Sequence, residues 1–160
     1  MKAGLCKSLV GPSALKLETL EDPEASPDEV IVAVEACALN FFDTLITRGK
    51  YQFKPDLPFS PGGEIAGRII KVGSKVAGWK LGDRVTAYIG WGGAREEIAV
   101  TPERLVAIPQ GVSSEAASAT SITYGTAIHG LRDRAGLQPG DRVAVLGLSL
   151  IHISEPTRRN

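Results

Sequence analysis

The sequence predicts a mainly β fold with some α structure, in which a small twisted or barrel-like sheet precedes a helical region and one buried strand. Through about residue 110, short apolar segments are punctuated by glycine and proline, of which the chain has 18 and 10. After Pro109 the apolar residues recur at helical spacing. A short apolar strand then follows a Pro-Gly turn, and helix, turn and buried strand in this order are typical of the start of a parallel βαβ sheet.

Five segments of the first part carry the strand pattern. Each is rich in β-branched and other apolar residues and is bounded by turn residues, mostly glycine. The clearest is EVIVAVEACAL, which has apolar residues on both faces at its centre. The predicted strands cover residues 29–39, 64–73, 82–90, 94–100 and 103–109.

Two regions are predicted to be helical. In NFFDTLITRG, Asn40 is a suitable N-cap and Gly49 a suitable end for a short helix. The second region begins at a serine cap, Ser113 or Ser114, and ends at Gly136. An internal glycine and three threonines weaken this second region, so we expect two helical pieces rather than one rod.

Charge and hydropathy exclude several classes of partner. Eighteen basic residues balance 18 acidic ones, so no net field attracts nucleic acid. Lys7 interrupts the apolar start, and no run of about 18 apolar residues occurs, so we expect neither signal peptide nor membrane partner, and a cytoplasmic location. Cys6 and Cys37 are the only cysteines, and we expect two buried, reduced thiols.

Three motifs follow one another along the chain: NFFDTLITRGKYQFKPDLPFSPGGEIAG, VGSKVAGWKLGDRV and TYGTAIHGL. Over residues 1–147 the sequence resembles the zinc-independent quinone oxidoreductase (zeta-crystallin-like) family of the medium-chain dehydrogenase/reductase superfamily. The resemblance implies a GroES-like, partly open β-barrel that carries the substrate side. It also implies a following helix and the first strand of a truncated Rossmann domain, the domain that binds NADPH in this family.

The resemblance implies domain boundaries as well. Residues 1–112 would form the GroES-like substrate domain, and residues 113–147 the connecting helix and first Rossmann strand. Gly147 fits the first glycine of the turn that lets the backbone approach a pyrophosphate. Residues 148–158, LSLIHISEPTR, resemble a translated sequencing adapter, so we expect residues 148–160 to be a non-native, disordered tail on an N-terminal fragment.

The zinc ligands of related alcohol dehydrogenases are missing at the corresponding positions. Those enzymes use a Cys near the first helix and the His of a Gly-His-Glu motif, where this chain has Asn40 and Gly63. Glu64 alone cannot make a site, and two isolated cysteines cannot supply a closed four-ligand structural site. We therefore expect no metal.

The resemblance points to two catalytic candidates. A nicotinamide supplies the hydride itself, so the protein has to orient and polarise the acceptor. The amide of Asn40 would face the cleft beside the nicotinamide, and the hydroxyl of Tyr51 would donate to a quinone oxygen. Each has a structural alternative, since Asn40 is also a helix cap and Tyr51 also packs its loop.

Cofactor binding is expected to involve Asn40, Thr123 and Gly147. Thr123 matches a threonine that contacts the nicotinamide amide in the family, and its alternative is a hydrogen bond to its own helix carbonyl. Asp43, early in a helix, and Glu64 are assigned structural roles.

Three hypotheses about the function of the chain follow from these observations. The first is an NADPH-dependent quinone oxidoreductase acting on a small-molecule quinone or activated carbonyl, of which this chain is the N-terminal portion and is itself inactive. The second is an enal or enoyl reductase of the same superfamily. The third is a non-catalytic, truncated fragment that binds no cofactor tightly. The parent protein is expected to be a homodimer, and the fragment is not.

Overall fold

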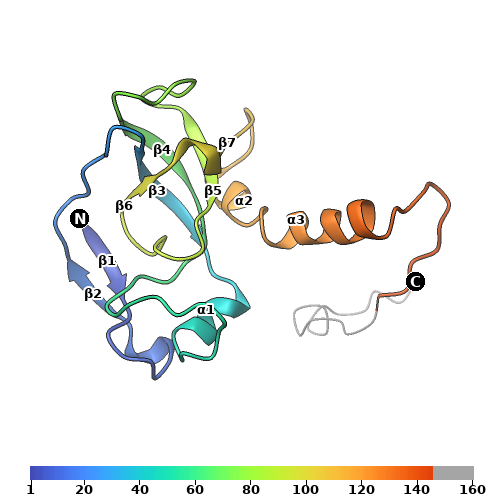
Figure 1. Ribbon diagram of the computed structural model, residues 1–160, viewed down its shortest axis with the longest axis horizontal. Helices are drawn as coiled ribbons and strands as arrows, with labels where there is room; N and C mark the ends of the chain where they lie inside the picture. The colour runs from blue at the N-terminus through green and yellow to red at the C-terminus, as the bar shows by residue number, and fades with distance from the viewer. Residues whose placement is uncertain (146–160) are drawn as a thin grey trace. The chain divides into compact units, whose positions relative to one another are not determined.

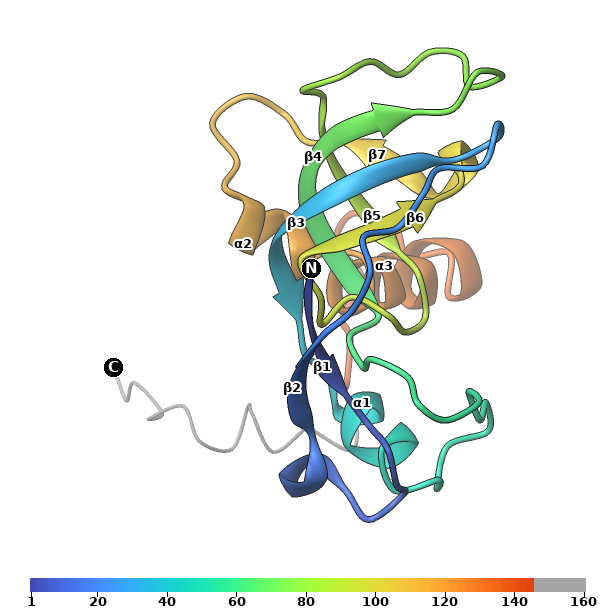
Figure 2. The ribbon, with the colours of Figure 1, turned by 90° about the vertical axis from the view of Figure 1, so that its left-hand side faces the viewer.

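A five-stranded antiparallel sheet organises the first part of the chain. The computed structural model describes residues 1–145, and these belong to two units, Met1–Ala127 and the part of Ile128–Asn160 up to residue 145. In the first unit the strand order is β6-β3-β4-β5-β7 (Figures 1 and 2). The strands are β3 (Val30–Ala38), β4 (Glu64–Val72), β5 (Arg84–Tyr88), β6 (Glu97–Val100) and β7 (Leu105–Ala107). All five predicted strands are confirmed.

The centre of this sheet is the main core of the unit. Its largest cluster of buried side chains comes from β3, β4, β5, β6 and β7, and includes Val32, Ile65, Ile69 and Val85. Burying each such side chain stabilises the fold by roughly 1.5–3 kcal/mol. At Gly67 a Cβ atom would lie 1.9 Å from the carbonyl oxygen of Ala33 on β3. The close approach of β3 and β4 therefore requires glycine at this position.

The sheet is open, in agreement with the predicted partly open, GroES-like barrel. Within residues 1–145, its edge strands β6 and β7 do not pair with each other. A separate two-stranded antiparallel sheet, β1 (Lys2–Leu5) with β2 (Lys16–Thr19), lies beside α1 (Figures 1 and 2). It was not predicted, because each strand has only 4 residues, which is too few to establish a period in the sequence, and β2 is mostly exposed.

The helix α1 (Phe41–Ile46) begins where predicted and ends at Ile46, three residues before the predicted stop at Gly49. Asn40 is its N-cap, with extended backbone angles of φ −115° and ψ 168°. The carboxylate of Asp43, in the first turn, accepts a hydrogen bond of 2.7 Å from the backbone N–H of Asn40. Gly49, at φ 65°, follows the helix in the left-handed conformation that favours glycine. The 3-10 helices are Pro12–Ala14 and Pro102–Arg104.

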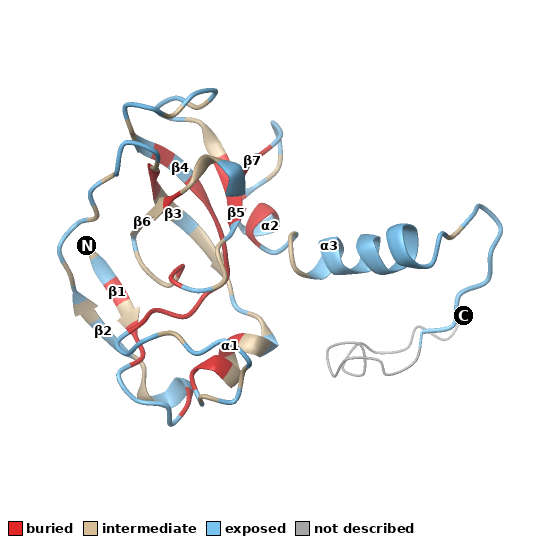
Figure 3. Cartoon of the chain, in the orientation of Figure 1, coloured by how far each residue is buried: buried red, intermediate tan, exposed pale blue. Residues whose placement is uncertain are grey.

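The predicted split of the second helical region is confirmed. The helix α2 (Ser114–Ser118) is capped by Ser113, whose hydroxyl accepts from the N–H of Ala116 at 3.2 Å. The helix α3 (Thr123–Ile128) follows. In the second unit, residues His129–Arg134 form a π-helix, and Gly136 follows at φ 62°. Figure 3 shows α3 and the residues after it as exposed, in contrast to the sheet.

The predicted first Rossmann strand, residues 142–147, needs correction. Residues 142–145 form no strand, and Val143 and Val145 are exposed. The physical reason is that a strand needs a neighbour to complete its hydrogen bonds, and the described residues provide none for this segment. Gly147 and the adapter-like residues 148–158 lie outside the described residues. Among residues 1–145, no helix has the length and apolarity needed to cross a membrane.

Candidate functional site

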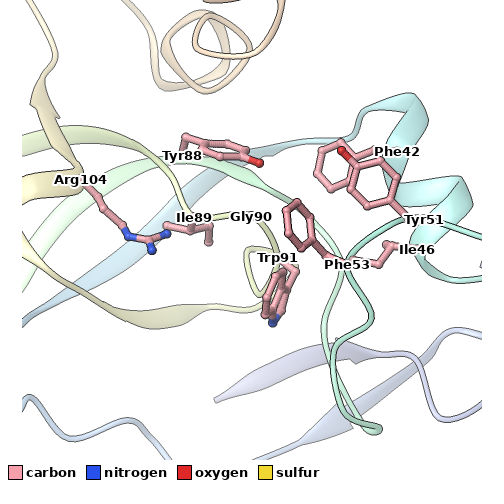
Figure 4. A pocket seen from close by; sticks show the side chains of 9 residues that line it. All are labelled: Phe42, Ile46, Tyr51, Phe53, Tyr88, Ile89, Gly90, Trp91 and Arg104. Atoms are coloured by element: carbon pink, nitrogen blue, oxygen red, sulfur yellow. The ribbon is translucent and has the colours of Figure 1, made fainter. Parts of the chain in front are cut away.

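An aromatic hollow of about 320 Å³ opens between α1, the loop after it and the end of β5. Figure 4 shows the side chains around it, with the aromatic rings from several segments directed toward a common space. The rings of Phe42 and Tyr51 are 5.5 Å apart, and those of Tyr51 and Phe53 are 6.0 Å apart, both tilted. Its lining residues are Phe42, Ile46, Tyr51, Phe53, Tyr88, Ile89, Gly90, Trp91 and Arg104. We call this space the aromatic hollow.

A second space, the helix-side hollow, has a similar volume of about 320 Å³. Phe42, Tyr51 and Tyr88 line both hollows, so these three rings form a shared wall. The other lining residues come from the segment between α2 and α3 and from α3. They are Ser121, Ile122 and Thr126.

Glu64 connects the beginning of α1 to the segment before α3. Its side chain, at the start of β4, is only 1% exposed. One carboxylate oxygen accepts from Nδ2 of Asn40 at 2.9 Å, and the other accepts from the backbone N–H of Ile122 at 2.6 Å. These bonds satisfy the buried carboxylate and orient the Asn40 amide with its nitrogen toward Glu64, because two facing oxygens would repel. The structural role predicted for Glu64 is therefore a bridge between two distant segments.

Asp43 fixes the loop before β4. Its side chain is 5% exposed, and its second oxygen accepts from the N–H of Gly62 at 2.8 Å. Burial raises the pKa of the Asp43 carboxyl, and the hydrogen bonds from Asn40 and Gly62 oppose that shift. Gly62 has φ 91°, and a Cβ there would lie 2.4 Å from Sγ of Cys37. Asp43 thus fixes a loop in which position 62 has to be glycine.

Cys37 is a poor nucleophile in this environment. Burial, together with the negative charges of Asp43 and Glu64, raises the pKa of its thiol to about 11. Cys6 lies in a separate buried cluster with Ile46 and Phe59, and burial raises the pKa of its thiol as well. Both cysteines are free thiols, and Cys6 is buried as predicted, whereas Cys37 is only half-buried.

The residues at the zinc positions do not fit a zinc ion. A Cβ atom on Gly63 would lie 2.4 Å from Cζ of Phe42 and 2.9 Å from the carbonyl oxygen of Gly90, so no ligand side chain fits there. Asn40 is hydrogen-bonded to Glu64 instead of being free to bind a metal. Among residues 1–145, no three His, Cys, Asp or Glu side chains lie together as a metal site requires.

The structure brings some of the predicted site residues together and separates others. Tyr51 lines both hollows, and Asn40 lies two residues before Phe42 of the shared wall. Thr123 is exposed and lines neither hollow, and its hydroxyl donates to the carbonyl oxygen of Ala119 at 2.7 Å. Gly147 lies outside the described residues. The roles of all four remain proposals.

Sequence reasoning missed the residues that the end of β5 contributes. Tyr88 and Trp91 face the aromatic hollow together with Phe53 (Figure 4). The only signal was the density of aromatic residues in TAYIGW, at the end of the strand predicted over residues 82–90. That signal does not show whether these aromatic side chains line a hollow or pack in the core.

Comparisons with known proteins agree with this architecture. Residues 26–110 match the family described as the alcohol dehydrogenase GroES-like domain. The chain is 41% identical over 160 residues to quinone oxidoreductase-like protein 2 homolog of Nematostella vectensis, covering 96% of this chain and 44% of that protein. It is 38% identical over 159 residues to quinone oxidoreductase-like protein 2 of Bos taurus, covering 96% of this chain and 45% of that protein.

Solved structures show the same likeness. The quinone oxidoreductase of Thermus thermophilus, also solved in complex with NADPH, superposes with a TM-score of 0.74 and 37% identity, covering 88% of this chain and 43% of that one. A probable oxidoreductase of Mycobacterium abscessus superposes with a TM-score of 0.82 and 37% identity, covering 86% of this chain and 44% of that one. The chain spans less than half the length of these relatives. It belongs to the alcohol dehydrogenase GroES-like domain family, and its relatives there include quinone oxidoreductases of the medium-chain dehydrogenase/reductase superfamily.

Proposed function

We propose that this chain is the quinone-binding part of an NADPH-dependent quinone oxidoreductase. The observation that carries the proposal is the aromatic hollow, whose rings lie beside the Asn40–Glu64–Ile122 bridge. A quinone is planar and largely apolar, so it gains from burial and from contact with tilted aromatic rings, at about 0.5–1.5 kcal/mol per ring pair beyond the buried area. Relatives named quinone oxidoreductase support the same substrate class.

Two polar side chains are available to polarise the acceptor. Tyr51 lines the hollow, and its hydroxyl is our proposed hydrogen-bond donor to a quinone oxygen. Asn40 uses one amide hydrogen on Glu64, which leaves the second amide hydrogen for the acceptor or for the nicotinamide. Donors held in place before the reaction stabilise the negative charge that develops on the quinone oxygen.

NADPH supplies the hydride when it is bound, and we propose that the helix-side hollow faces it. Thr123 gives its hydroxyl hydrogen to Ala119, so its oxygen lone pairs are left to accept an amide N–H of the nicotinamide. Gly147 keeps its proposed place in the pyrophosphate-binding turn. The Phe42 ring beside Gly63 supports a zinc-independent enzyme, since it takes the space of a ligand at that position.

The activity is tested by following the loss of NADPH absorbance with the quinone menadione, using this chain joined to a cofactor-binding portion. We expect turnover of menadione and little turnover of an α,β-unsaturated aldehyde. The reverse preference would support the enal reductase alternative. The 160-residue chain is the control, and we expect no turnover from it. Homodimerisation of the parent protein and a cytoplasmic location also stay proposals.

A further inference from the structure

Arg104 is the one charged residue among the nine that line the aromatic hollow. We infer that the hollow takes a planar quinone bearing an ionised acidic substituent, and that Arg104 pairs with this substituent. This inference rests on the proposed function and specifies its substrate class. Figure 4 shows the Arg104 side chain extending toward Ile89 at the edge of the hollow.

The backbone of Arg104 is held in place while its side chain is exposed. Arg104 ends the 3-10 helix that Pro102 begins. The next residue, Leu105, is 8% exposed and pairs with Ala87 of the central strand β5. The guanidinium therefore starts from a fixed point beside the hollow and needs only side-chain rotation to reach a ligand.

Arg104 has no partner of its own among residues 1–145: its side chain makes no ion pair and no hydrogen bond there. Glu29 is an acidic residue that lines a separate hollow of about 240 Å³ together with Trp91 and Arg104. Glu29 instead accepts a hydrogen bond of 2.6 Å from the Ser26 hydroxyl. The positive charge at the aromatic hollow is thus left for an anionic group.

The chemistry of arginine favours an acidic substituent over a neutral one. The planar guanidinium presents paired N–H donors that match a carboxylate or another oxyanion. It is exposed to solvent, so the gain is modest and falls as salt increases. We expect an anionic quinone to bind about three- to tenfold more tightly than a neutral one of the same size at low ionic strength.

The test uses the 160-residue chain and two quinones of similar shape. Lawsone carries a hydroxyl that is ionised at neutral pH, and its methyl ether is neutral. Trp91 lines the hollow, and Trp79 is the only other tryptophan, so the Trp79→Phe chain reports binding through quenching of Trp91 fluorescence. The raised thiol pKa of Cys6 and of Cys37 leaves little thiolate to add to the quinones at neutral pH.

Arg104→Gln is compared with Lys80→Gln, which removes the same charge from an exposed residue that lines neither the aromatic nor the helix-side hollow. We expect Arg104→Gln to abolish the preference for lawsone while the methyl ether binds as before, and Lys80→Gln to keep the preference. Equal binding of both quinones, or equal effects of the two substitutions, overturns the inference and leaves the proposed function standing. If neither quinone binds, both the inference about Arg104 and the proposed function are overturned.

Discussion

The strands β3 to β5 and residues 119–145 differ in how they bury their apolar side chains. In the strands, Val32, Ile65 and Ile69 are at most 1% exposed. In residues 119–145 no residue is buried, and Tyr124 is 66% exposed although it lies in a helix (Figure 3). The hydrophobic pattern correctly predicts the strands of the sheet and the helix α3, but residues 142–145 form no strand. Apolar side chains form a core only where other described residues pack against them.

The largest expected effect comes from glycine substitutions in the two regions. Gly67→Ala places a methyl group 1.9 Å from the Ala33 carbonyl oxygen, and nothing lies within 4 Å of the same atom at Gly125 in α3. We expect Gly67→Ala to lower the free energy of unfolding by about 4 kcal/mol or to prevent folding. Gly125→Ala should raise or leave unchanged the helicity of α3. Urea unfolding measures the free energy of unfolding of the Gly67→Ala chain, and circular dichroism measures the helicity of the Gly125→Ala chain. A Gly67→Ala chain of normal stability would contradict the close approach of β3 and β4 at this position.

A smaller effect is expected where the two regions meet. Glu64→Gln replaces a carboxylate that accepts from Asn40 and from the Ile122 N–H, and the new amide group must face one of these donors. We expect the free energy of unfolding to fall by about 2 kcal/mol. Hydrogen exchange at the Ile122 amide should also become faster than in the parent chain.

The matched control is Glu24→Gln, at an exposed loop position, which should change stability by less than about 0.5 kcal/mol. Equal effects of the two glutamate substitutions would show that the bridge does not stabilise the fold.

The smallest effect is a pH dependence within the sheet region. With its pKa raised from 9.0 to about 11, the Cys37 thiol stays protonated in the folded chain at pH values where it ionises in the unfolded chain. The unfolded chain then binds fewer protons, so stability falls as pH rises from about 9 toward 11. In urea unfolding, Cys37→Ala should make the free energy of unfolding fall less steeply between about pH 9 and pH 11. A cavity left by the substitution would instead lower the free energy of unfolding by the same amount at every pH. An unchanged slope would mean that the environment of Cys37 does not raise the pKa of its thiol.

Most of the sheet and α1 could be predicted because their signals are local. Asn40 caps the start of α1, Gly49 lies in the turn that follows its end, and each strand segment shows its own pattern between turn residues. The short strands β1 and β2 could not be predicted, because four residues are too few to establish a period, although Ala3 and Leu5 of β1 are buried. The segment 142–145 matched a strand pattern, but a pattern does not provide the neighbouring strand.

The candidate site was less predictable because it is assembled from separate segments. Tyr51 and Asn40 were found through a family resemblance. Tyr88, Trp91 and Arg104 come from the end of β5, the loop after it and a 3-10 helix, and only the pairing of β5 with β4 and β7 brings them to the same hollow. The bridge from Glu64 to Ile122 spans 58 positions, a separation that no local pattern can reveal.

The wall shared by the two hollows has a thermodynamic consequence. Phe42, Tyr51 and Tyr88 contact both spaces, so a ligand that turns one of these rings enlarges one space as it reduces the other. Two ligands that turned these rings would therefore be linked through the same three side chains. Linkage is reciprocal, so the ligand in each hollow would change the affinity of the other hollow for its ligand by the same factor.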